Sequence, residues 1–172
     1  MNAAARDRFA FLGREFLTWL WFEAETNKGA VDTPTFGPVR VDFGERLTLE
    51  TGGNVREGST VQAEAPLLVE ESRVALRTGK KVAKARLVLE VGERTFRLGL
   101  DAETLTLAQV KLPTVLSTED APRVDERLLL LDELEAVVDE MYARFVRLRA
   151  DATVWGPVRD EMRRWVAAAA PT

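Results

Sequence analysis

Apolar positions at helical spacing predict a first helix over residues 4–26, with Asn27 and Gly29 available to end it. The large apolar side chains of this helix are not confined to one stripe. They are Phe9, Phe11, Leu12, Phe16, Leu17, Trp19, Leu20, Trp21 and Phe22. A helix that is apolar over much of its circumference is either enclosed in the core or covered by a second subunit. The pattern alone leaves both alternatives open.

Alternation of apolar and polar positions predicts strands farther along the chain. Residues 26–38 are rich in Gly and Pro and indicate a loop, after which two strands are expected at 39–43 and 47–49. A turn over 51–58 precedes a third strand at 59–65. Pro66 then begins a helix that ends before Gly79, and its acidic residues lie early and its basic residues late, as the helix dipole favours.

A β-hairpin over residues 83–100 has the clearest local pattern. Apolar residues alternate from 83 to 91 and from 96 to 100, and Gly92-Glu93 between them suits a two-residue turn. This turn pairs residue 89 with 96, 87 with 98 and 85 with 100, and all three pairs are apolar. The opposite face then carries Lys84, Arg86 and Arg97. Residues 105–112 extend the sheet, and residues 113–122 form a loop.

A long helix is predicted over residues 123–150, and a last helix begins near Pro157. The long helix has apolar residues at alternating spacings of three and four, namely Leu131, Leu134, Val138, Met141, Phe145 and Leu148. Such a seam suits either core packing or a dimer contact. We therefore expect one α+β domain over residues 1–172. Its antiparallel sheet of hairpins is flanked by an aromatic N-terminal helix, a short central helix and a long C-terminal helix, and two copies form a homodimer through the N- and C-terminal helices.

Composition narrows the functions that such a domain can carry. The chain has 172 residues, of which 46% are hydrophobic, and it contains neither Cys nor His. Disulfides, thiolate metal sites, the usual general base and the usual transition-metal ligand are therefore absent. We expect a protein that is not an enzyme and needs no cofactor. No stretch reaches the roughly 20 apolar residues of a membrane span, so a cytoplasmic location is expected.

The charges of the chain are unevenly distributed. Residues 73–97 contain eight basic and two acidic side chains, a local balance of +6 in a chain with a net charge of −4. The basic residues of this strip are Arg73, Arg77, Lys80, Lys81, Lys84, Arg86, Arg94 and Arg97. A concentrated positive strip on an acidic protein favours a polyanion, most commonly a phosphate backbone. All of these residues except Arg94 are assigned here to binding DNA, on one contiguous surface.

The type of nucleic acid follows from the residues beside the strip. Phe96 is predicted to point inward, so that the outer face lacks aromatic side chains for stacking. Binding should therefore favour the backbone of a duplex over unstacked single strands, without reading the sequence. A strip of this size predicts a slope of log affinity against log salt of about −4 to −6 per subunit.

The order of these elements resembles the recombination-associated protein RdgC family of bacteria over roughly residues 9–150. The stretch Phe11-Leu-Gly-Arg-Glu-Phe-Leu-Thr-Trp-Leu-Trp21 is similar to the opening helix of short RdgC-like proteins. Residues 45–53, the helix that ends in Thr78-Gly79-Lys80, the hairpin over 82–100 and an apolar terminal helix are similar to the later part of full-length members.

This resemblance implies a nucleoid-associated, non-enzymatic protein that forms a closed dimeric ring around duplex DNA and modulates recombination by restraining recombinase filaments. The positions that match the basic lining of the ring are Lys80, Lys81, Lys84 and Arg86. The familiar members are much longer, and the first portion of their chain has no counterpart in this sequence.

Two other classes of function fit the same residues. A protein-interaction module would dock an acidic or helical partner on the basic strip or on the first helix, and would not bind nucleic acid. A metal-dependent nuclease needs carboxylates and a Lys but no His, and Asp101 with Gln109-Val110-Lys111 resembles part of such a set. A second carboxylate for that set is not evident.

Overall fold

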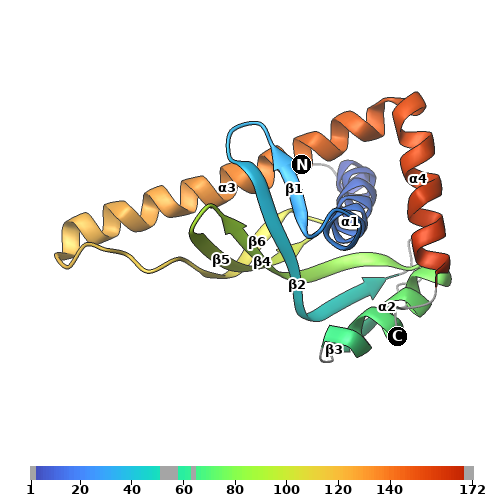
Figure 1. Cartoon of the computed structure of the whole chain (residues 1–172), viewed down its shortest axis with the longest axis horizontal. Helices are drawn as coiled ribbons and strands as arrows, with labels where there is room; N and C mark the ends of the chain where they lie inside the picture. The colour runs from blue at the N-terminus through green and yellow to red at the C-terminus, as the bar shows by residue number, and fades with distance from the viewer. Residues whose placement is uncertain (1–2, 51–57, 63–64, 169–172) are drawn as a thin grey trace.

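The computed structural model describes residues 3–50, 58–62 and 65–168 and confirms an α+β fold (Figure 1). These residues form four helices and a six-stranded antiparallel sheet. In chain order the elements are α1 (Ala3–Thr26), β1 (Ala30–Thr33), β2 (Gly37–Glu50), β3 (Gly58–Gln62), α2 (Ala65–Arg77), β4 (Lys81–Val91), β5 (Arg94–Asp101), β6 (Thr106–Lys111), α3 (Asp120–Ala150) and α4 (Ala152–Ala167).

The sheet is built around the predicted hairpin. Its main path runs β1-β2-β4-β5-β6. The same edge of β2 pairs with β1 along its first half and with β3 along its second half. The hairpin of β4 and β5 pairs Ala85 with Leu100, Leu87 with Leu98 and Leu89 with Phe96, which confirms the predicted register. The turn between them places Gly92 at a φ of 58°, a left-handed conformation that glycine adopts without strain.

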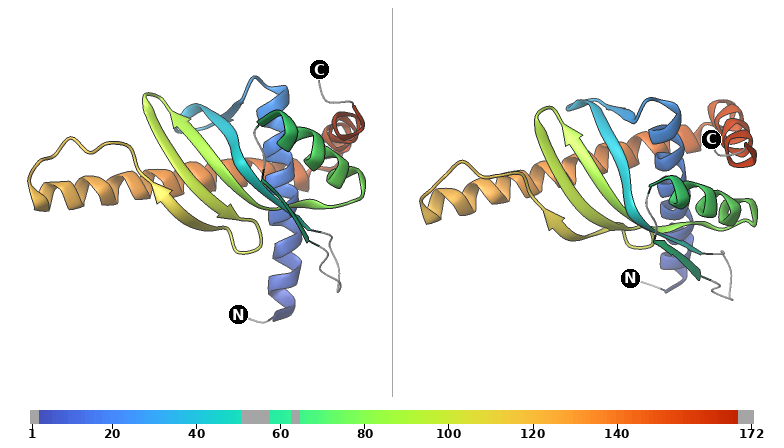
Figure 2. Two further views of the ribbon diagram at one scale, coloured as in Figure 1. Left: turned by 90° about the horizontal axis from the view of Figure 1, so that it is seen from below. Right: turned by 60° about the horizontal axis from the view of Figure 1, so that its bottom comes forward.

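The second half of α1 lies in the interior of the molecule, and its N-terminal end extends beyond the sheet (Figure 2). One side of α1 packs on the sheet, chiefly on β4, and the other side is covered by α3 and α4. The Trp19 ring lies 5.6 Å from that of Phe145 on α3, and the Trp21 ring lies 5.3 Å from that of Trp165 on α4. All residues from Phe16 to Phe22 are buried. For this part of α1, enclosure within the core is therefore the correct alternative.

The contact between α1 and the sheet depends on a glycine. An ideal Cβ placed on Gly13 would lie 1.7 Å from the carbonyl oxygen of Ala102, which follows β5. No side chain fits in that space, so the helix backbone rests directly on the backbone at the end of β5. One turn farther along α1, the Thr18 hydroxyl accepts a hydrogen bond of 3.2 Å from the backbone N–H of Val82. These two contacts fix the distance between α1 and the sheet and the position of α1 along it.

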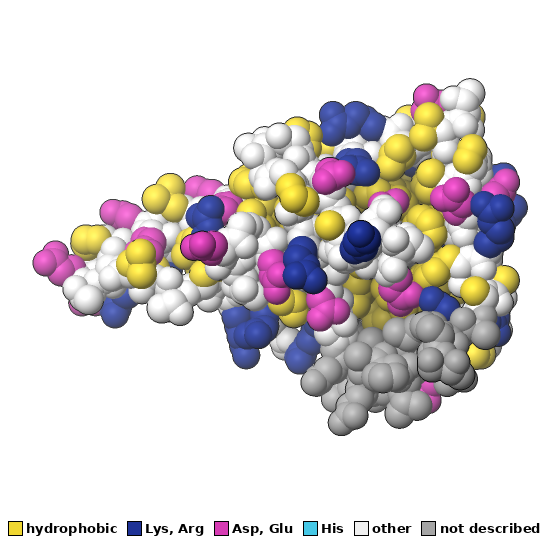
Figure 3. Space-filling model, viewed as in Figure 1, with side chains coloured by type: hydrophobic (Ala, Val, Ile, Leu, Met, Phe, Trp, Pro, Cys, Tyr) yellow, Lys and Arg dark blue, Asp and Glu magenta, His cyan; other side chains and the backbone are white. Residues whose placement is uncertain are grey.

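Helix α3 has two parts with different surroundings. From Leu130 onward it packs in the core through Leu134, Val138, Met141 and Phe145, so this part of the predicted seam serves core packing. The start of α3 and the loop that precedes it project beyond the sheet as an arm, here defined as residues 112–129 (Figure 1). Its exposed apolar side chains are Leu116, Val124, Leu128 and Leu129. In the space-filling view, acidic and apolar side chains gather on the projecting part (Figure 3).

Within the arm, Glu126 holds the incoming loop against the helix. Its carboxylate accepts hydrogen bonds from the backbone N–H groups of Leu116, at 2.9 Å, and Ser117, at 3.0 Å. These bonds stabilise the ionised form and lower the pKa of Glu126. The loop therefore follows a defined path along α3.

Several predicted boundaries differ from the structure. The loop expected over 26–38 contains β1, and the two strands expected at 39–43 and 47–49 form one strand, β2, with a register irregularity between Phe43 and Leu47. Helix α4 begins five residues before Pro157, because the Asp151 carboxylate accepts hydrogen bonds from the N–H groups of Thr153 and Val154. The turn expected over 51–58 lies almost entirely outside the described residues. None of the helices in the described ranges is long and apolar enough to cross a membrane.

We expect Gly13→Ala to destabilise the protein by about 2 kcal/mol or more, because the new methyl group forces α1 away from Ala102. Helix propensity alone favours alanine over glycine by about 1 kcal/mol, so the expected sign is opposite to the propensity. Gly156→Ala in α4 is the matched control, since a Cβ there meets no atom within 4 Å, and it should be neutral or stabilising. Urea denaturation measures both. Equal stability of the two variants would contradict the proposed contact.

Candidate functional site

The outward face of the sheet is the side of β4 and β5 that points away from α1. Side chains on the two faces alternate along both strands, and those on the inner face are buried. On the outward face every residue retains some exposure; these residues are Lys84, Arg86, Val88, Glu90, Thr95, Arg97, Gly99 and Asp101. The predicted positions Lys84, Arg86 and Arg97 therefore lie on one open surface. Phe96 is fully buried on the other side, as expected.

A shallow hollow of about 660 Å³ lies on this face, around Arg86. Arg86 pairs with Gly99 on β5, and an ideal Cβ on Gly44 of β2 would lie 3.6 Å from the Cβ of Arg86. Because both flanking residues are glycines, the floor on either side of Arg86 is backbone. A ligand can therefore approach the sheet closely beside the Arg86 guanidinium.

Two more cations line the same hollow. Arg97 on β5 pairs in register with Lys111 on β6, and both border the hollow. Within the described part of the chain, no carboxylate lies within ion-pair distance of Arg86, Arg97 or Lys111. The Arg86 guanidinium donates a hydrogen bond of 2.9 Å to the Gln109 side-chain oxygen, which orients it over the hollow. Three positive charges thus converge on one small area.

Lys84 lies on the same face, but its charge is balanced. Its Nζ is 2.7 Å from a carboxylate oxygen of Asp101, and the hydrogen bond and charge of Asp101 raise the pKa of Lys84. Burial acts to raise the pKa of Asp101, but the hydrogen bonds from Lys84 and from the Glu103 N–H together outweigh it and lower that pKa. The pair therefore stabilises the fold between the ordinary pKa values of 3.8 and 10.5, and this contribution is lost at more extreme pH on either side.

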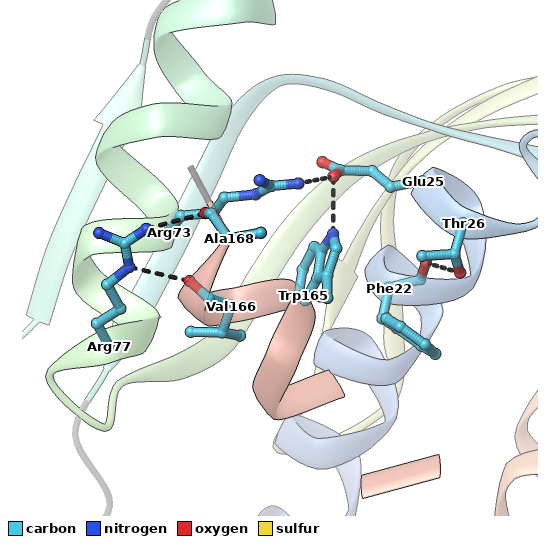
Figure 4. A network of polar contacts seen from close by, with 8 residues as sticks. All are labelled: Phe22, Glu25, Thr26, Arg73, Arg77, Trp165, Val166 and Ala168. Carbon is cyan, nitrogen blue, oxygen red and sulfur yellow. Dashed lines mark hydrogen bonds and ion pairs between the residues drawn. The ribbon is translucent and has the colours of Figure 1, made fainter. Parts of the chain in front are cut away.

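Arg73 and Arg77 stand on α2, away from the outward face, which corrects the expectation of one contiguous strip. Figure 4 shows their contacts with α1 and α4. Arg73 is only 6% exposed, and it donates a hydrogen bond of 2.6 Å to Glu25 while its guanidinium lies 5.2 Å from the centre of the Trp165 ring. Trp165 donates to the same carboxylate oxygen of Glu25 at 2.9 Å. This network joins α1, α2 and α4.

Arg77 holds the end of α4. Its guanidinium donates hydrogen bonds to the carbonyl oxygens of Val166 and Ala168, both at 2.9 Å (Figure 4). It donates a third, of 3.2 Å, to the carbonyl oxygen of Ala167. The last carbonyls of a helix have no partner within it, so Arg77 supplies one from α2. The positive charge also opposes the negative end of the helix dipole.

The other basic residues of the strip lie apart from the hollow. Lys81 forms an ion pair of 3.0 Å with Glu15 on α1, and it borders a second pocket together with Lys80 and residues of α4. Arg94 forms an ion pair of 2.6 Å with Glu133 on α3. Of the eight basic residues, only Lys84, Arg86 and Arg97 share the outward face. Lys111, which borders the hollow, was not among the residues assigned to DNA.

Asp101, Gln109 and Lys111 share the neighbourhood of the outward face, but Asp101 is held by Lys84. Among the described residues, no group of three carboxylates gathers closely enough to hold a metal ion. The chain matches no known family model and no curated protein sequence. The RdgC resemblance therefore stays a prediction from the sequence.

We expect Arg73→Met to lower the free energy of unfolding by about 2–3 kcal/mol, because it leaves the partly buried Glu25 without its cation. Arg86→Met removes the same charge from an exposed site and should change stability by about 0.5 kcal/mol or less. Thermal and urea unfolding of the two variants measure the difference. If both variants are equally stable, the network of Arg73, Glu25 and Trp165 does not hold α2 in place.

Proposed function

We propose that the outward face binds duplex DNA through its phosphates, without reading the base sequence. The observation that supports this proposal is the convergence of Arg86, Arg97 and Lys111 on one hollow with no acidic partner in the described part of the chain. Two of these residues are arginines, whose planar guanidinium groups suit phosphate oxygens. A role in modulating recombination is supported only by the resemblance to the RdgC family.

The surface around the hollow favours a duplex over an unstacked single strand. The described side chains of the outward face include no aromatic ring on which a base could stack. The backbone floor beside Gly44 and Gly99 instead lets a phosphate chain lie close to the sheet. Phosphate contacts position a protein on DNA but carry no sequence information.

The number of available cations supports weaker DNA binding than the sequence suggested. With Arg73 and Arg77 engaged elsewhere, three cations remain at the hollow, and a slope of log affinity against log salt near −3 follows at about −0.9 for each phosphate contact. The chain as a whole is acidic, with a net charge of −4. We therefore expect binding that is weak at physiological salt and much stronger at low salt.

Protein docking is the second candidate function, and the exposed apolar side chains of the arm favour it. Leu116, on the loop of the arm, is 88% exposed, and Leu129 is 69% exposed. Val124 and Leu128, on the same part of α3 as Leu129, are also exposed. Such a patch on a projecting helix is typical of a protein contact, including contact with a second copy of this chain. In this case the protein should self-associate or capture a protein partner through the arm and should not bind DNA.

We expect the double variant Arg86→Glu/Arg97→Glu to bind a random-sequence duplex about tenfold more weakly or worse, because two attractive charges become repulsive. The matched control is Arg159→Glu/Arg163→Glu on α4, which changes the net charge equally but lies away from the hollow. Fluorescence anisotropy at about 50 and 200 mM salt measures affinity and slope. Equal weakening in both variants would mean that only net charge matters and that the outward face is not the site.

We expect Asp101→Asn to strengthen binding about two- to threefold and to steepen the salt slope by about −0.9, because Lys84 then becomes available to a phosphate. The asparagine oxygen can still accept the hydrogen bond from the Glu103 N–H, so the local backbone should be retained. The same anisotropy titration measures this gain. A variant that folds normally but binds no better than the parent would place Lys84 outside the DNA contact.

A further inference from the structure

A second pocket, of about 430 Å³, lies between α1, the end of α2 and α4, away from the hollow. Its floor is apolar and comes from Leu76, Trp155, Met162 and Val166. The Trp155 ring packs edge-on against Phe145 of the core with ring centres 5.7 Å apart, and both Trp155 and Leu76 are largely buried. The floor is therefore anchored to the core. The volume of the pocket falls within the range of about 300–1,000 Å³ that is usual for small-molecule sites.

The rim of this pocket is strongly basic. The cations on it are Arg77, Lys80, Lys81, Arg159 and Arg163, and the single acid is Glu15. Glu15 is already shared between Lys81, at 3.0 Å, and Arg149, at 2.9 Å. Arg159 and Arg163 lie one helical turn apart, and both approach one carboxylate, that of Asp160, at 3.6 and 3.5 Å. Arg159 and Arg163 thus share one carboxylate between two cations and together keep a positive charge.

The end of α4 does not oppose an anion at this pocket. The last carbonyls of a helix carry partial negative charge and would repel an anion bound beside Val166 and Ala167. Here those carbonyl oxygens accept hydrogen bonds from Arg77 instead. The one electronegative feature of the rim, apart from Glu15, is thus neutralised by the fold itself.

From the apolar floor and the cationic rim together, we propose that this pocket binds a small amphipathic anion. The ligand has an aliphatic or aromatic body that lies on Trp155 and Met162, and a carboxylate, sulfate or phosphate head beside Arg159 and Arg163. A polyanion such as DNA leaves the apolar floor unused, and a cationic amphiphile is repelled by the rim. The binding is independent of the proposed DNA site, since the two pockets share none of the residues that border them.

Isothermal titration calorimetry with dodecanoate, kept below its micelle concentration, tests this proposal. The parent protein should bind one dodecanoate per chain and should not bind dodecyltrimethylammonium, which has the same chain length and the opposite charge. Arg159→Glu/Arg163→Glu should weaken dodecanoate binding about tenfold or more. Arg86→Glu/Arg97→Glu on the outward face is the matched control and should leave it unchanged.

A second readout locates the bound chain. A brominated dodecanoate should quench tryptophan fluorescence in the parent, and much of this quenching should disappear in Trp155→Phe. Met162→Trp, which fills the pocket, should abolish dodecanoate binding without unfolding the protein, as checked by circular dichroism.

Three outcomes would overturn the proposal. They are equal affinity for the cationic amphiphile, unchanged affinity in Arg159→Glu/Arg163→Glu, and binding to vesicles that contain anionic phosphatidylglycerol without binding to monomeric dodecanoate. The last outcome would identify the basic rim as a membrane-surface contact instead of a pocket for a free ligand. Loss of DNA binding in the outward-face variant has no bearing on these results, so the two proposals fail separately.

Discussion

The architecture depends on covering the inner part of α1 on every side. Its segment from Phe16 to Phe22 presents large apolar side chains all around the helix, and one layer cannot bury them. The sheet takes one side, with the backbones of Gly13 and Ala102 in direct contact, and α3 and α4 take the other. All the helices that cover α1 thus lie on the same side of the sheet as α1. The opposite face of β4 and β5 is left to solvent, which is why charged residues can occupy it.

Basic residues that are close in the sequence perform different tasks because they lie on different elements. Arg73 and Arg77 stand on α2, which packs against α4, so their guanidinium groups meet Glu25 and the helix end. Arg86 and Arg97 stand at outward positions of two strands and border the hollow on that face. Arginine therefore joins helices together at Arg73 and Arg77 and provides surface charge about ten residues later in the chain.

The elements that the sequence predicts well are those that depend on local pattern. The register of the β4–β5 hairpin follows from Gly92 and the alternation beside it, and the outward placement of Lys84, Arg86 and Arg97 follows from the register. The burial of Arg73 depends on Glu25, 48 residues earlier in the chain, and on Trp165, far later in the chain. No local sequence pattern indicates contacts between residues so far apart. On β6, Lys111 pairs with Arg97 and Ala108 pairs with Gly99, and the register shifts between these two pairs. Gln109 lies in this irregular stretch with a φ of 51°, and the shift brings Lys111 to the hollow. Strict alternation does not predict that irregularity.

The projecting arm also changes the hydrodynamic behaviour of the molecule. A body with a long arm experiences more friction than a sphere of the same mass, and it therefore elutes earlier from a size-exclusion column (Figure 1). A 19.2 kDa monomer of this shape would be assigned too large a mass by comparison with globular standards. Elution volume alone would thus overestimate the number of subunits. That number has to come from a method that measures mass independently of shape, such as light scattering.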